Sequence, residues 1–182
     1  MNITIQERRF TFSSEYEISG SGQILRARKD FLSFPARIHV KYGEDRVGTL
    51  QGRFSLIHCK YDFQFADGRD FAFQCEKLRK GVYACKRGDE VYRLYHHKGR
   101  RYSIFRNGDQ IAAVERNRYV AGRSARFDVR MNQDADVAVV ASMVIAMNSS
   151  ERKEGEDEEA VRAERGGTRR EDKAFDVNWQ PS

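Results

Sequence analysis

The apolar run from Ala135 to Met147 constrains the fold more than any other part of this chain. It is the only long hydrophobic stretch in a protein of 182 residues with a mean hydropathy of −0.75. Its Val and Ile residues leave a buried strand as the alternative. Its length of roughly 13 residues and its Ala and Met residues favour a helix instead. We therefore predict a helix at about 134–149 that is apolar on every side and has to be buried all round.

The ends and the length of this helix decide between protein and lipid surroundings. Asp134 is the expected N-cap, Asp136 is expected to add negative charge to the first turn, and Ser142 is expected to bond back to its own helix. At ~1.5 Å per residue the run spans ~20 Å, whereas a bilayer core is ~30 Å thick. We favour a core helix over a membrane span and predict no transmembrane segment. The first ten residues lack an apolar block, so no signal peptide is predicted.

The first 131 residues alternate between apolar and polar side chains, as in Arg37–Tyr42, Lys60–Phe65 and Ala125–Met131. Turn signals such as Asp67-Gly68 and Asn107-Gly108 recur about every ten residues. About twelve strands of this kind form a sandwich or a closed barrel, and only a large barrel can hold a fully apolar helix. We therefore predict a mainly β protein, in which residues 1–150 form a closed antiparallel barrel of about twelve strands around a buried C-terminal helix.

The segments Tyr92–Arg116, Arg126–Met131 and Asp134–Met147 resemble the late strands and terminal helix of the tubby C-terminal-like barrels. These include the LURP-one-related proteins and the phospholipid scramblases. The resemblance covers about residues 1–150 and implies a twelve-stranded barrel around a C-terminal helix. The chain lacks the Pro-rich arm, the cysteine cluster and the acidic calcium loop of animal scramblases, so scramblase activity is not carried over. The headgroup-binding positions of the tubby proteins cannot be assigned to particular residues here.

The predicted barrel is strongly basic, because residues 1–150 carry 26 basic and 17 acidic side chains. Such a surface attracts anionic lipids or nucleic acid. The alternative is that the basic side chains only solubilise strands and protect their edges. The chain shows no aromatic stacking face interleaved with basic residues, so nucleic acid is not the expected partner. The expected partner is an anionic membrane surface. The candidate headgroup-binding residues are Lys77, Arg79, Lys80, Lys98, Arg100, Arg101, Arg116 and Arg118.

The sequence contains no constellation typical of catalysis. His96 and His97 are adjacent in a strand and would point to opposite faces, so they cannot chelate a metal together. Cys59, Cys75 and Cys85 lack the spacing of a zinc site, and their odd number suggests reduced thiols in a cytoplasmic protein. We predict a protein that is not an enzyme and has no cofactor and no metal, located in the cytoplasm or peripherally at a membrane.

The C-terminal part after the helix has a different composition. Residues 151–173 carry nine acidic and seven basic side chains and no aromatic one, which predicts a disordered segment or a solvated helix. Residues 174–182 form a short apolar patch with Phe175 and Trp179, the only tryptophan. This patch is either a frayed terminus or a tether that docks on the barrel or on a protein partner. The second option leads to the alternative function, a soluble interaction or regulatory scaffold.

Overall fold

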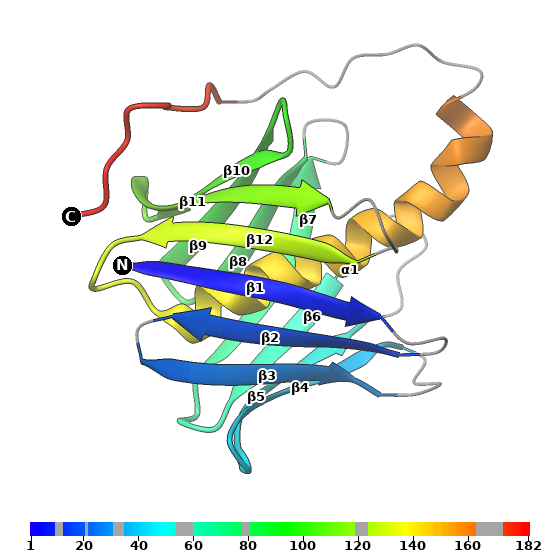
Figure 1. Cartoon of the computed structure of the whole chain (residues 1–182), viewed down its shortest axis with the longest axis vertical. Helices are drawn as coiled ribbons and strands as arrows, with labels where there is room; N and C mark the ends of the chain where they lie inside the picture. The colour runs from blue at the N-terminus through cyan, green and yellow to red at the C-terminus, as the bar shows by residue number, and fades with distance from the viewer. Residues whose placement is uncertain are drawn as a thin grey trace.

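The strands of the barrel follow one another in chain order around the wall (Figure 1). The structure is a computed structural model that describes residues 1–9, 13–20, 22–30, 35–53, 60–77, 81–118, 124–162 and 173–182. The strands are β1 (Asn2–Arg9), β2 (Ser14–Gly20), β3 (Gln23–Lys29), β4 (Arg37–Tyr42), β5 (Asp45–Gly52), β6 (Lys60–Phe65), β7 (Asp70–Lys77), β8 (Val82–Arg87), β9 (Glu90–His97), β10 (Arg101–Arg106), β11 (Asp109–Arg118) and β12 (Ala125–Met131).

The barrel closes because the first strand pairs with the last. β1 and β12 run antiparallel, with Ile5 opposite Phe127, and every other strand pairs with its neighbours in sequence. The burial of β12 alternates along its whole length, and that of β2 along its first five residues, as the period of two predicts. The predicted closed antiparallel barrel is therefore confirmed.

The hairpin between β10 and β11 shows how the predicted turns work. Asn107 and Gly108 have φ angles of 52° and 105°, so both central residues lie in the left-handed region. Two-residue turns of this kind match the twist of the flanking strands, and Asn and Gly adopt them at the lowest steric cost. The Asn107 side chain adds a hydrogen bond, because its Oδ1 accepts from the Val91 backbone N–H at 2.8 Å.

The single helix of the described residues, α1 (Val137–Arg162), passes through the barrel (Figure 1). Every residue from Val139 to Asn148 is buried, on all sides of the helix. The inward side chains of the strands and the apolar residues of α1 form one hydrophobic core. The helix continues beyond the predicted end at 149 and leaves the barrel before Arg162. No helix in the described part of the chain combines the length and the hydropathy needed to cross a membrane.

The start of the helix differs from the prediction. α1 begins at Val137, and the carboxylate of Asp136 accepts hydrogen bonds from the backbone N–H groups of Ala138 at 2.8 Å and Val139 at 3.1 Å. Asp136 is thus the N-cap, because these are the N2 and N3 donors that a cap satisfies. The expected cap, Asp134, instead forms an ion pair with Arg106. The prediction of Asp134 as N-cap was wrong because α1 begins three residues after it, and only Asp136 directly precedes the first helical residue.

Two polar groups inside the barrel also depart from expectation. Ser142 Oγ makes no hydrogen bond among the described residues. The hydrogen bond to the helix backbone that was expected of Ser142 is made by Ser150 instead, whose Oγ donates to the Ala146 carbonyl at 2.5 Å. Near that point the Asn148 amide donates to the Tyr16 hydroxyl at 3.2 Å, and that hydroxyl donates to fully buried Glu7 at 3.4 Å. A short polar chain therefore links β1, β2 and α1.

Candidate functional site

The two ends of the barrel carry different charges. We call the end where α1 starts the helix-entry rim and the end where it leaves the helix-exit rim. Counting the described turn residues and the two terminal residues of each strand, the helix-exit rim has 13 basic and three acidic residues. The helix-entry rim has seven basic and nine acidic ones. Because the strands alternate in direction, every second turn along the chain lies at the same rim. The turns at the helix-exit rim are the ones that carry most of the basic residues.

The described candidate residues lie at the helix-exit rim. Lys77 ends β7, Lys98 and Arg100 form the turn between β9 and β10, and Arg101 begins β10. Arg118 ends β11, and the backbone N–H of Arg116 donates to the Arg100 carbonyl at 3.0 Å. The topology therefore brings the ends of β7, β9 and β11 to one rim. The two remaining candidates, Arg79 and Lys80, lie outside the described residues.

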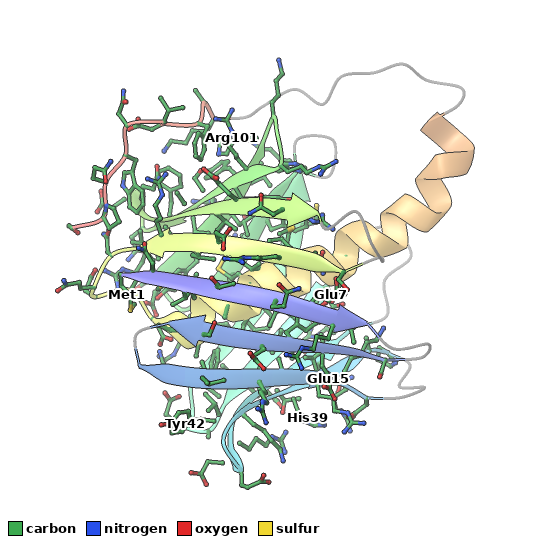
Figure 2. All side chains as sticks on the ribbon, viewed as in Figure 1. Met1, Glu7, Glu15, His39, Tyr42 and Arg101 are labelled. Atoms are coloured by element: carbon green, nitrogen blue, oxygen red, sulfur yellow. The ribbon has the colours of Figure 1, made fainter. Side chains whose placement is uncertain are left out.

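These basic side chains are not equally accessible. Lys77, Lys98 and Arg100 are exposed. The Arg101 guanidinium lies 4.6 Å from the centre of the Phe175 ring and donates through Nε to the Lys98 carbonyl at 3.2 Å. Figure 2 shows Arg101 beside the C-terminal segment. The Arg116 guanidinium lies 5.5 Å from the Phe127 ring centre. The rim therefore offers Lys77, Lys98 and Arg100 to a ligand more readily than Arg101 or Arg116.

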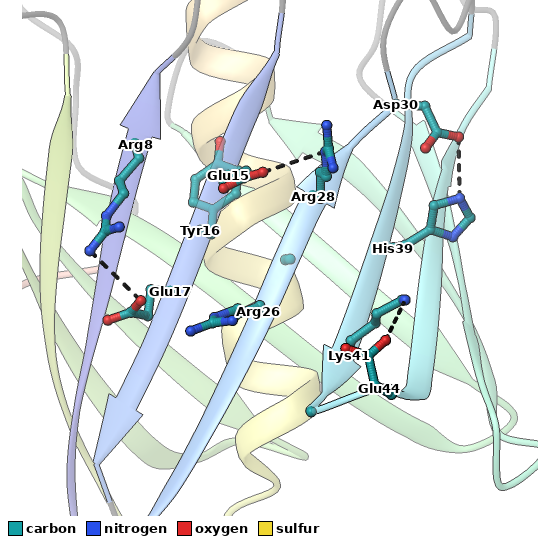
Figure 3. A pocket seen from close by; sticks show the side chains of 12 residues that line it. Arg8, Glu15, Tyr16, Glu17, Arg26, Arg28, Asp30, His39, Lys41 and Glu44 are labelled. Atoms are coloured by element: carbon teal, nitrogen blue, oxygen red, sulfur yellow. Dashed lines mark hydrogen bonds and ion pairs between the residues drawn. The ribbon is translucent and has the colours of Figure 1, made fainter.

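A groove of about 500 Å³ lies on the outer face of β1–β4 (Figure 3), and Arg8, Glu15, Arg28 and Asp30 at one end of it also belong to the helix-exit rim. None of the predicted residues lines it. The charged side chains along it are Arg8, Arg26, Arg28 and Lys41, against Glu15, Glu17, Asp30 and Glu44.

Most charges in this groove are paired with one another. Arg28 lies 3.4 Å from Glu15, Arg8 lies 3.8 Å from Glu17, and Lys41 lies 3.9 Å from Glu44. His39 Nε2 lies 3.2 Å from the Asp30 carboxylate (Figure 3). Four cations against four carboxylates give the groove little net attraction for an anion. Sequence reasoning missed it because its members come from four strands and form no charge cluster along the chain.

The thiol and phenol groups of the barrel interior belong to buried side chains of the core. Cys75 and Cys85 are both buried. Burial raises the pKa of the Cys85 thiol far above its ordinary value, which keeps it protonated and a poor nucleophile. Burial likewise raises the pKa of the Tyr92 hydroxyl, which donates to Glu90 at 2.7 Å. Among the described residues, no group of three His, Cys, Asp or Glu side chains could hold a metal ion.

Glu76 provides a pH-dependent contribution to stability. Its carboxylate, on β7, lies 2.8 Å from Lys86 of β8 and 3.1 Å from Arg93 of β9. Partial burial alone would raise the pKa of Glu76, but the hydrogen bonds from Lys86 and Arg93 outweigh it and lower the pKa below 4.5. A depressed folded-state pKa stabilises the protein above the unfolded-state pKa, and this stabilisation is lost as the pH falls through the folded-state value.

We therefore expect Glu76→Gln to lower the free energy of unfolding at pH 7, and the difference from the wild type to shrink below about pH 4.5. Urea unfolding of both proteins between pH 3 and 7 measures this. Glu44→Gln is the control, because Glu44 is fully exposed and its partner Lys41 is 3.9 Å away. A Glu76→Gln deficit that stays constant down to pH 3 would contradict the assigned pKa shift.

Comparison with known proteins places the barrel in a family. The model of the LURP-one-related family matches residues 1–148. No curated protein matches the chain, and no solved structure does. The matched residues include all twelve strands and α1 as far as Asn148, the last residue of its continuously buried stretch. The match thus covers 148 of the 182 residues and coincides with the barrel and its central helix, and the chain belongs to the LURP-one-related family, whose domains are part of the tubby-like superfamily.

Proposed function

We propose that this protein is a non-catalytic barrel module that binds anionic phospholipid headgroups at its helix-exit rim. The observation that carries the proposal is the charge difference between the rims, 13 basic and three acidic residues against seven and nine. A rim with this excess of cations produces a field that attracts an anionic membrane surface, and each Lys or Arg near such a surface contributes ~1 kcal/mol. The protein would then be peripheral at the cytoplasmic face of a membrane.

Lys98 and Arg100 are the residues that we expect to contribute most. Both are exposed in the turn between β9 and β10, and Lys77 of the neighbouring β7 is exposed as well. The paired groove on β1–β4 is a weaker candidate, because its carboxylates offset its cations. The helical residues 151–162 extend α1 past this rim and carry six acidic and three basic residues. Because this net negative charge weakens the attraction of the rim for an anion, the binding test has to use the full chain.

The test is sedimentation with vesicles of phosphatidylcholine alone, or with added phosphatidylserine or phosphoinositide. We expect binding to the anionic vesicles only, weakening as salt is added. The double variant Lys98→Glu/Arg100→Glu should bind at least roughly 30-fold more weakly, since the two lost cations alone correspond to ~2 kcal/mol and the two added carboxylates are repelled by the anionic surface. The control Arg46→Glu/Arg87→Glu makes the same charge change at the helix-entry rim, where both residues are exposed.

Two results would overturn the proposal. One is equal sedimentation with neutral and anionic vesicles. The other is an equal loss for both double variants, which would show that only the net charge of the chain matters. Preference for one phosphoinositide over phosphatidylserine at equal vesicle charge would identify the headgroup class.

A further inference from the structure

The outer face of β9 and β10 contains side chains that a barrel wall normally leaves in water. Inward-facing Leu94 and Ile104 belong to the core around α1. Three side chains that lie an odd number of residues from Leu94 or Ile104 also have low exposure: His97 at 2%, Ser103 at 1% and Phe105 at 8%. Because side chains alternate across a strand, these three point outward and need a separate cover.

This cover comes from the C-terminal segment, which we define as residues 173–182. The Lys173 ammonium lies 3.5 Å from the centre of the Phe105 ring and 5.9 Å from that of Tyr95. The Phe175 ring lies 5.2 Å from the His97 ring, and the Arg101 guanidinium lies 4.6 Å from the centre of the same Phe175 ring. Figure 1 shows the segment alongside the barrel wall, outside the strands. Of the two expectations for this patch, the contacts favour a docked tether over a frayed terminus.

The surface under the segment is built from two subsites, and we call it the docking face. Tyr95 and Phe105 meet edge to face, with centres 5.4 Å apart and an angle of 89°, and together form an aromatic surface for a cation. His97 and Arg101 receive an aromatic ring two residues further along the bound segment. The Ser103 hydroxyl fixes the His97 ring through a contact of 2.7 Å with Nε2.

The segment is held as a bound peptide is held. It contributes no strand to the barrel, so its release leaves the hydrogen bonds between all twelve strands intact. Its far end is fixed by two hydrogen bonds of the Ser182 backbone: the Ser182 N–H donates to the Asn132 side-chain Oδ1 at 3.0 Å, and the Gln133 N–H donates to the Ser182 carbonyl at 3.1 Å. Recognition at the docking face itself rests on a lysine and on a phenylalanine two residues later.

We propose that the docking face is a recognition surface for an extended peptide segment of a partner protein that carries a lysine two residues before an aromatic residue. In this structure the chain's own C-terminal segment occupies the surface and competes with that partner. A tethered competitor acts at an effective concentration in the millimolar range, so it sets the affinity that a partner must exceed. This inference does not depend on headgroup binding, although Arg101 belongs to both surfaces.

Trp179 makes the segment observable, because it is the only tryptophan of the chain and is half-buried. The probe is a synthetic peptide of residues 171–182 with Trp179→Phe, which adds no tryptophan emission. The protein is the full chain with Phe175→Ala, which weakens the tethered competitor. Titration of this probe should release the tethered segment and shift the Trp179 emission to longer wavelength until it saturates. The same probe with Lys173→Ala and Phe175→Ala should leave the emission unchanged.

A second measurement tests the competition and the face separately. A fluorescently labelled peptide of residues 171–182 should bind the Phe175→Ala chain at least about tenfold more tightly than the wild type, as read from anisotropy. Adding Phe105→Ala to that chain should abolish binding, whereas adding Tyr42→Ala, at an exposed tyrosine, should not. Circular dichroism confirms that each variant is folded. The inference is overturned if the wild type and Phe175→Ala bind equally, if the alanine probe binds as well as the native one, or if no peptide binds.

Discussion

Replacing Val144 with aspartate is expected to prevent the barrel from folding. Val144 is fully buried near the middle of the inner part of α1, with residues Val139 to Asn148 buried on all sides. A carboxylate at this position has no ordinary route to water and loses its hydration on folding. An uncompensated buried charge costs about 3–5 kcal/mol, a large share of the roughly 5–15 kcal/mol by which most domains are stable. Circular dichroism and recovery in the soluble fraction measure the outcome.

The chain offers a matched control for this substitution. Val177→Asp makes the same chemical change at a valine that is 62% exposed, and it should alter the free energy of unfolding by less than about 0.5 kcal/mol. If Val144→Asp abolishes folding, Ile145→Ala supplies a measurable variant, because deleting buried methyl groups costs about 2–5 kcal/mol without introducing a charge. A Val144→Asp protein that unfolds cooperatively near the wild-type midpoint would contradict the central position of α1.

The second large effect is expected for Phe73→Ala. The Phe73 ring stacks on Phe63 with centres 5.3 Å apart and on Tyr83 at 5.7 Å, and it meets Tyr61 edge to face at 6.4 Å. These rings come from β6, β7 and β8 and fill the space between the wall and the helix. Removing the central ring leaves a cavity that its rigid neighbours cannot fill, and Phe→Ala changes of this kind cost about 3–5 kcal/mol.

Chemical denaturation of the purified variants measures this loss. Phe73→Leu keeps most of the volume and should cost clearly less than Phe73→Ala. Tyr42→Ala removes an aromatic ring that is 46% exposed and should have a small effect. If Phe73→Ala and Tyr42→Ala lost equal amounts of stability, the aromatic stack would not be part of the cooperative core.

The strands and the helix were predictable because each depends on a local pattern. The alternation in segments such as Ala125–Met131 is the same whatever the strand pairs with, and a uniformly apolar run needs burial in any fold. The helix cap was not predictable to the residue. Asp134 and Asp136 have similar sequence contexts, and Arg106 and Arg69, which lie 28 and 67 residues away, bind one each. Asp136 binds Arg69 and still caps α1, because it directly precedes Val137, the first residue of the helix.

The candidate site, too, could be predicted where a local charge pattern defines it and could not where contacts between distant residues do. Lys77, Lys98 and Arg100 could be selected from local charge clusters, and alternating strand direction explains why one rim holds them all. The burial of Glu7 could not be foreseen, because a charged residue next to Arg8 and Arg9 looks like surface, yet it faces Tyr16, which in turn binds Asn148. The contact between the Arg101 guanidinium and the Phe175 ring was equally unpredictable, since 74 residues separate the two along the chain.

The sequence by itself therefore determined the twelve alternating strands, the turns between them and the requirement that the apolar run be enclosed. These follow from the period of side-chain burial and from length, which are properties of neighbouring residues. Only the tertiary structure decided which charges share a rim, which carboxylate caps α1 and what covers the outer face of β9 and β10. Those contacts depend on the closure of β1 onto β12 and on the path of the chain after α1, which join residues far apart in sequence.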